Sequence, residues 1–297
     1  MALFRYFLSN PNSVSLAYFA LCIYSRIRSH LRTMAPSPQA LSELPLPAAD
    51  YNNLPYVQDV HEVTKTCDAE AARENLLRLI SDHGLSDVFS IHLLHKHFDV
   101  PEAHVMVYET VSDPSHPTYQ VMAPRKPENM PSLRAKYFFV ASDGTMKAYE
   151  YTADPQPDIV EHVDFCSMLW EEIHRLRMQD IFSVGVRPYF SLSNYTEIEI
   201  PHAQATVFVE NFDMAGSIET DWANPSQRWD EGLPLSQAST IKGRCRFGHK
   251  RHSSISPESM AKDECGNDVL YLDGKCLPAG CGVFNVLTSA MDYVSVV

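Results

Sequence analysis

Short β-like runs that follow one another without regular helices between them constrain the fold of this chain more than any other feature. Turn signals separate several of these runs, and Ser142, Asp143 and Gly144 form the strongest of them. Because strands and helices do not alternate, the sequence predicts an α+β fold with a largely antiparallel sheet and a few helices. The predicted strands cover residues 88–98, 104–111, 119–123, 135–141, 146–151, 188–192, 196–200 and 205–209.

Two helices are predicted beside these strands. Asp68 is a suitable N-cap for a helix over residues 69–83, which Gly84 would end. Asp154 opens a second helix that we expect to run to about Met178. The segment 99–102, Asp-Val-Pro-Glu, predicts a hairpin between the first two strands.

The segment IHLLHKHFDVPE, residues 91–102, has the highest density of chemically active side chains. His92, His95 and His97 fall within six residues, and Glu102 follows five residues after the last of them. Imidazole is the commonest protein ligand of Zn, Fe, Cu and Ni and titrates near neutral pH, so the segment predicts metal binding or proton transfer. In a strand, side chains alternate, so His95 and His97 share one face and His92 lies on the other.

We therefore predict His95, His97 and Glu102 as catalytic residues, and His92, His95 and His97 as ligands of a divalent metal, Zn or Fe. Two other interpretations stay open. In a helical segment, His92 and His95 would share a face and would need a third ligand from elsewhere. Alternatively, some of these histidines are core residues that hydrogen-bond to backbone carbonyls.

Two resemblances rest on this segment. The spacing His95-x-His97-x4-Glu102 is similar to part of the first cupin motif, which implies a divalent metal held by these residues. The glycine expected beyond the glutamate is absent, and His202 is the best candidate for a second motif. The run LLHKHF, residues 93–98, and the cysteine-containing C-terminus resemble a family of uncharacterised fungal proteins. That resemblance spans residues 76–282 and implies an origin but no activity.

A second constellation lies within residues 243–282. Cys245, His249, Cys276 and Cys281 could form a closed, structural zinc site, because nearby glycines let the backbone turn around thiolates. Their spacing departs from the usual Cys-x2-Cys. Buried reduced thiols, or a disulfide between Cys276 and Cys281, are the alternatives.

Composition excludes several classes of function. The formal net charge is −13, and the only basic excess beyond the N-terminus is at residues 243–252, which argues against nucleic-acid binding. Signatures of serine hydrolases, nucleotide-binding proteins and zinc peptidases are absent. We expect small molecules or proteins as partners, and no membrane. Seven cysteines, an odd number, indicate a reducing compartment.

The first 42 residues contain no Asp or Glu. Their apolar run, residues 14–24, is shorter than the roughly 20 residues of a spanning helix. This composition indicates a mitochondrial presequence or an extension before a true start at Met34. We therefore predict an N-terminal extension over 1–33, an irregular Pro-rich arm over 34–58 and a single α+β domain over 59–297, in the cytoplasm or alternatively the mitochondrion.

The sequence supports two hypotheses of function. The first is a soluble protein of small-molecule, secondary metabolism, whose His-centred site binds a divalent metal that activates water, oxygen or a carbonyl. The second is a non-enzymatic protein with structural histidines and a zinc-stabilised C-terminal segment that contacts partners.

Overall fold

A computed structural model describes most of the chain beyond its N-terminus. The described residues are 41–42, 45–112, 118–141, 144–187, 194–210, 212, 217–223, 241–248, 251–252, 254–272 and 274–296. The predicted strand 188–192, the predicted ligand His249 and the extension 1–33 lie outside these ranges. Residues 41–297 form one compact unit, which is described below. Within the described part, no helix has the length and hydropathy needed to cross a membrane.

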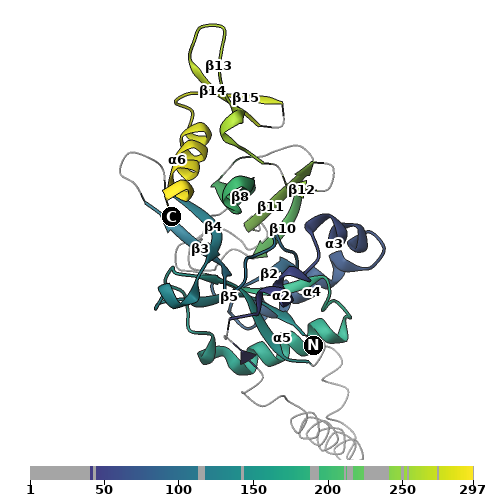
Figure 1. The fold of residues 1–297 in the computed structure, drawn as a ribbon. Helices are drawn as coiled ribbons and strands as arrows, with labels where there is room; N and C mark the ends of the chain where they lie inside the picture. Colours follow the sequence, from purple (N-terminus) through teal and green to yellow (C-terminus); the bar gives the residue numbers. More distant parts are fainter. Residues whose placement is uncertain are drawn as a thin grey trace, which may run out of the picture. The chain divides into compact units, whose positions relative to one another are not determined.

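A twelve-stranded mixed sheet forms the centre of this unit (Figure 1). Most neighbouring strands are antiparallel, and the pairs β1–β6, β3–β6 and β8–β11 are parallel. Its strands are β1 (Leu41–Ser42), β2 (Phe89–Leu93), β3 (Val105–Val111), β4 (Tyr119–Arg125), β5 (Arg134–Val140), β6 (Met146–Thr152), β7 (Phe182–Val186), β8 (Asn194–Ile200), β9 (Ala205–Glu210), β10 (Ser217–Ala223), β11 (Ile241–Gly248) and β12 (Arg251–His252).

The sheet closes on itself. Hydrogen-bonded neighbours follow the order β6-β3-β4-β9-β8-β11-β10-β2-β7-β5, and β5 pairs with β6 to complete the path. The result is barrel-like, with an inner face that is separate from the outer one. The expected mostly antiparallel sheet with a few helices is confirmed, but the sheet is barrel-like, and its closure was not predicted.

Helices and a small second sheet surround the closed sheet. The β13–β14–β15 sheet is antiparallel throughout. The helices are α2 (Ala48–Asn52), α3 (Val57–Thr64), α4 (Ala69–Asp82), α5 (Val163–Arg175) and α6 (Gly282–Val296), with 3-10 turns η4 (Pro127–Asn129), η5 (Ile159–His162), η6 (Pro201–Ala203) and η8 (Pro257–Ser259). The small sheet contains β13 (Met260–Lys262), β14 (Asp268–Leu272) and β15 (Lys275–Pro278).

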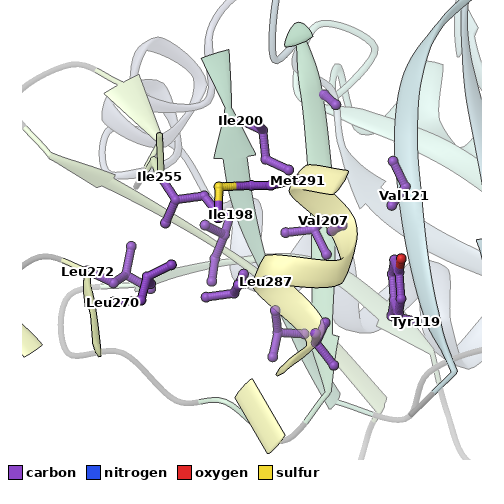
Figure 2. Packing of buried hydrophobic residues seen from close by; sticks show 14 of the residues in the cluster. Tyr119, Val121, Ile198, Ile200, Val207, Ile255, Leu270, Leu272, Leu287 and Met291 are labelled. Carbon is purple, nitrogen blue, oxygen red and sulfur yellow. The ribbon is translucent and has the colours of Figure 1, made fainter. Parts of the chain in front are cut away.

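The outer face of β8 and β9 is covered by α6. Ile198 and Ile200 of β8 and Val207 of β9 pack in one core cluster with Leu287 and Met291 of α6 (Figure 2). Apolar residues of β14 join the same cluster. Because this cover buries the outward residues, both faces of these strands are shielded from water.

Local patterns predicted most elements within a few residues. The helix at 69–83 is α4, and Gly84 ends it with a φ of +68°. The second helix begins later than expected, since α5 starts at Val163, after the short turn η5. The predicted hairpin between β2 and β3 is wrong, because β2 pairs with β7 and β10.

Part of the expected irregular arm is structured. Residues 45–58 include α2 and the start of α3, although we expected no regular structure before residue 59. Leu46, Tyr51 and Leu54 are buried in a core cluster with aromatic residues of the closed sheet. Apolar residues spaced along a Pro-rich segment therefore hold it against the sheet.

Candidate metal centre

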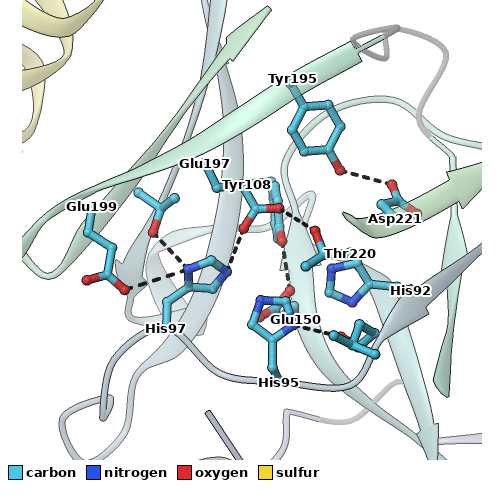
Figure 3. Close-up of polar contacts among 12 residues, drawn as sticks. His92, His95, His97, Tyr108, Glu150, Tyr195, Glu197, Glu199, Thr220 and Asp221 are labelled. Carbon is cyan, nitrogen blue, oxygen red and sulfur yellow. Dashed lines mark hydrogen bonds and ion pairs between the residues drawn. The ribbon is translucent and has the colours of Figure 1, made fainter. Parts of the chain in front are cut away.

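The histidines lie where the chain leaves β2. The Leu94 N–H donates to Ile181 O at 2.8 Å and the Lys96 N–H donates to Pro55 O at 2.9 Å, which holds the segment on both sides of His95. His95 and His97 therefore project from a fixed loop, with 4.9 Å between their ring centroids (Figure 3). Both side chains are buried.

His95, His97 and Glu197 form a group that could hold a metal ion. Each offers one ligand atom, these atoms lie within 4.8 Å of one another, and all three residues are buried. His97 Nε2 lies 3.1 Å from Glu197 Oε2. Two ligands of one tetrahedral ion, each about 2.1 Å from it, are about 3.4 Å apart, so this spacing fits a shared ion. Two imidazoles and a carboxylate form the donor set of catalytic zinc and non-haem iron sites.

A backbone contact fixes the tautomer of His95. Its Nδ1 lies 2.7 Å from Leu93 O. Because a carbonyl oxygen only accepts, Nδ1 carries the proton and donates it. In the neutral ring the lone pair is then on Nε2, as in metal-binding histidines whose other nitrogen donates to a carbonyl.

Neighbouring strands orient His97 and Glu197. His97 Nδ1 lies 3.3 Å from Thr206 Oγ1 of β9 and 3.9 Å from Glu199 Oε1 of β8. Thr220 of β10 donates to Glu197 Oε1 at 3.4 Å. These contacts are the kind of supporting shell that keeps ligand side chains in place.

His92 lies beside this group without belonging to it. Its ring stacks on His95 at 5.1 Å between centroids and lies 4.2 Å from the ring of Tyr137. Its Nδ1 is 3.1 Å from the Tyr149 hydroxyl. Burial, followed by the charges of nearby histidines and Lys136, lowers the pKa of His92 well below its usual value, so the ring is neutral at physiological pH.

The strand model of the histidines needs a correction. It placed His92 on the opposite face from His95 and His97, but β2 ends at Leu93 and the later two histidines lie in the following loop. The loop bends back so that His92 and His95 stack. The alternation of a strand therefore does not apply beyond Leu93.

The carboxylate at this centre is not the one that we predicted from the sequence. Glu102 is exposed in the turn before β3, and its carbonyl accepts a hydrogen bond from His104 at 2.8 Å. Glu197 of β8 stands with His95 and His97 instead. The cupin-like spacing thus does not describe the group that the fold assembles.

Glu197 was missed because its local sequence resembles a solvent-facing strand. In the segment TEIEI, residues 196–200, carboxylates alternate with isoleucines, which usually indicates a strand with one solvent-exposed face. Here Glu197 and Glu199 are 1% and 4% exposed, because they lie on the inner face of the closed sheet. The sequence signal that could have identified Glu197 as a site residue is the presence of two carboxylates in one short strand.

A buried acid lies near the metal centre. Tyr108 and Tyr51 donate to the two oxygens of Glu150 at 2.8 and 3.3 Å. Burial raises the pKa of Glu150 to about 8, although both phenols favour the ionised form. Burial raises the pKa of Tyr51 and the backbone of His97 opposes this rise, which places Tyr51 beside the histidine loop. Glu150 is therefore largely protonated at neutral pH and is linked to the histidine loop.

A cavity of about 600 Å³ reaches His97 and Glu199. Tyr56, Asp59 and Gln204 also line it. Its volume lies in the range of small-molecule sites, which are concave and carry a few convergent polar groups. Of the three candidate ligands, His97 alone is among the residues that line this cavity, so the cavity lies beside the candidate metal centre.

The C-terminal cysteines do not form the expected cluster in the described region. Cys276 on β15 is exposed and Cys281 is half-buried before α6; both are free thiols, so the alternative of a disulfide between them is wrong. Cys281 Sγ accepts a hydrogen bond from the Phe284 N–H at 3.3 Å. Among the described side chains, neither cysteine joins a metal-holding group. Cys245 is on β11, and its zinc-site role with His249 stays a prediction.

Comparison of the chain with family models, with curated proteins and with solved structures finds no match. Functional inference therefore depends on the site itself.

Proposed function

We propose that this protein is a divalent-metal enzyme of small-molecule metabolism, with His95, His97 and Glu197 as its metal ligands. One observation carries the proposal: three donor atoms of the right chemistry lie within 4.8 Å of one another in a buried position. The identity of the metal within the proposal is Zn or Fe, because both accept two imidazoles and one carboxylate.

The surroundings favour catalysis over a purely structural ion. Three protein ligands leave coordination positions for a substrate or water, whereas structural zinc sites have four. A metal bound there would act as a Lewis acid. A cavity lies beside His97, and the protonated Glu150 can donate a proton near neutral pH.

Elemental analysis of protein purified without a metal-affinity column tests the ligand set. We expect about one divalent ion per chain in the wild type. His95→Ala, His97→Ala and Glu197→Gln should each lose it. His104→Ala is the matched control, because this histidine is half-buried and lies outside the group. A wild type that holds no metal and takes up neither Zn²⁺ nor Fe²⁺ on dialysis would overturn the proposal.

A non-enzymatic protein with structural histidines is the second candidate. Each histidine has a polar protein neighbour, with Leu93 O beside His95 and the Tyr149 hydroxyl beside His92. In this candidate the C-terminal segment holds zinc and contacts partners. Zinc that is lost in Cys276→Ala but kept in His95→Ala, together with a lower melting temperature in His95→Ala, would favour it.

The proposal also includes an origin and a location. A fungal origin is supported by the resemblance at residues 93–98, and a cytoplasmic location is supported by the odd number of cysteines. Expression of a fluorescent fusion in a fungal cell, with mitochondrial staining as the comparison, tests the location.

A further inference from the structure

Lys136 of β5 is a buried lysine whose ammonium has no ion-pair partner among the described residues. Lys136 is 7% exposed. Its Nζ lies 4.4 Å from the centroid of the Tyr108 ring and 5.2 Å from that of Tyr137. Within the described part of the chain, Lys136 makes no hydrogen bond or ion pair. Ring faces compensate only part of the cost of burying an ammonium, and burial accordingly lowers the pKa of Lys136.

A bulge in β5 accounts for the position of this lysine. The pairing of β5 with β6 shifts register between Ala135 and Phe138. Such a bulge re-aims side chains, so that Lys136 and Tyr137 can both be buried although they are neighbours in sequence. Bulges of this kind occur frequently next to binding sites.

Asp221 carries a complementary atom without a partner. Its Oδ2 accepts hydrogen bonds from Tyr195 at 3.0 Å and from Tyr137 at 3.3 Å. The Ser90 hydroxyl also lies close enough to the Asp221 carboxylate to lower its pKa, but Oδ1 is buried and has no partner at hydrogen-bond geometry among the described residues. Burial raises the pKa of Asp221, and the charge of Lys136 is the largest opposing influence. Lys136 and Asp221 thus affect each other electrostatically without forming an ion pair, and Tyr137 contacts both.

These two groups lie beside the candidate metal centre. Asp221 of β10 is directly opposite His92 of β2 in the sheet (Figure 3). The His92 ring lies 4.2 Å from the Tyr137 ring and 5.1 Å from the His95 ring. A molecule that contacts Lys136 and Asp221 would therefore be held within one or two residues of His95.

The unpaired groups define the chemistry of a ligand. A simple anion would satisfy Lys136 but would add negative charge beside Asp221 and Glu197, and a simple cation would leave Lys136 unpaired. A zwitterion satisfies both groups and adds no net charge. The rings of Tyr108 and Tyr137 offer an apolar surface to its side chain.

We infer that the closed sheet binds an α-amino acid, whose carboxylate pairs with Lys136 and whose ammonium pairs with Asp221. This inference names the substrate class of the proposed enzyme and rests on that proposal for the reaction, although binding itself needs no metal. The two residues act as specificity-determining groups that position the amino acid next to His92.

Calorimetric titration of the full chain with L-phenylalanine tests the inference, and L-alanine serves as a smaller probe. The matched ligands are 3-phenylpropionate, which lacks the ammonium, and 2-phenylethylamine, which lacks the carboxylate. Because each charge forms a charge-assisted hydrogen bond, we expect L-phenylalanine to bind at least about tenfold more tightly than either analogue. If neither amino acid binds, or if the analogues bind as tightly, the inference is wrong.

Two variants separate the roles of the charges. Lys136→Met should weaken L-phenylalanine and 3-phenylpropionate but leave 2-phenylethylamine unchanged. Asp221→Asn should weaken the binding of L-phenylalanine and 2-phenylethylamine but leave that of 3-phenylpropionate unchanged. Lys65→Met, at an exposed ion pair with Glu62, is the control and should change none of the three affinities.

Thermal unfolding distinguishes a ligand-binding lysine from a structural one. Without ligand, Lys136→Met should melt at the same temperature as the wild type or higher, because it removes an unpaired buried charge. A lower melting temperature in both Lys136→Met and Asp221→Asn, without amino-acid binding to the wild type, would identify a water-bridged structural pair and would overturn the inference.

The metal proposal can fail separately. Titrations of chelator-treated protein, with its metal content measured, show whether the amino acid binds alone. Binding to a wild type that never holds metal would support this inference and contradict the metal enzyme. A metal-loaded wild type that binds neither amino acid would support the metal enzyme and contradict this inference.

Discussion

At the scale of single residues, Glu150 links burial to protonation. Its pKa is about 8 in the folded chain against 4.5 for an exposed glutamate. Below the lower value both states are protonated and the full stability is present. Between the two values only the unfolded chain loses the proton, so the free energy of unfolding falls as pH rises, by up to about 1.4 kcal/mol per pH unit.

We therefore expect Glu150→Gln to flatten the dependence of stability on pH. Glutamine keeps the shape of the protonated acid but has no proton to lose. Urea unfolding of both proteins at several pH values from 5 to 8, at constant ionic strength, gives the difference directly. Equal slopes in the two proteins would show that Glu150 is ionised in the fold.

Gly185 has no side chain, which lets Ser90 and the Tyr137 ring lie close to its backbone inside the sheet. A Cβ at this position would contact Ser90 Oγ and would lie 2.6 Å from Tyr137 Cε1. Gly185→Ala should therefore reduce the free energy of unfolding by about 1–3 kcal/mol through overpacking, and should move the Tyr137 ring. Gly282→Ala is the control, because a Cβ there has no neighbour within 4 Å. Denaturant unfolding of both variants checks the prediction; equal stabilities would contradict it.

At the scale of elements, the sequence predicted what is local and missed what depends on pairing. The helix α4 follows from an apolar face and Gly84 within one short segment, although the side chain of the predicted N-cap Asp68 makes no capping hydrogen bond. The partners of β2 are β7 and β10, which lie far along the chain, so no local pattern could identify them. The same limit explains the site: His95 and His97 were visible as a cluster, but Glu197 joins them only because the sheet closes.

The helix α6 gives an element-scale prediction. Leu287 is fully buried against the outer face of β8 and β9. Leu287→Ala should lower the free energy of unfolding by about 2–5 kcal/mol, because it removes buried methyl groups and leaves a cavity. Asp292→Ala on the same helix is exposed and should change stability little. Chemical unfolding of the two variants tests whether α6 is an integral cover of the sheet, and equal stability would show that it is not.

At the scale of the whole molecule, the candidate metal centre joins segments that are distant in sequence. His95 and His97 follow β2, Glu197 lies on β8, and their supporting groups Thr206 and Thr220 lie on β9 and β10. An unfolded chain cannot hold these ligands together. A metal that binds here therefore binds the folded state and stabilises it as a whole.

Zn²⁺ added to metal-free protein should consequently raise its melting temperature. At a free Zn²⁺ concentration one hundred times the dissociation constant, the free energy of unfolding rises by about 2.7 kcal/mol. The gain should be smaller at pH 6 than at pH 8, because protons compete with the metal for imidazole nitrogens. Glu197→Gln should lose this stabilisation, whereas His104→Ala should keep it. An equal rise in Glu197→Gln would mean that Zn²⁺ binds elsewhere on the folded chain, and the assignment of Glu197 as a ligand would then be wrong.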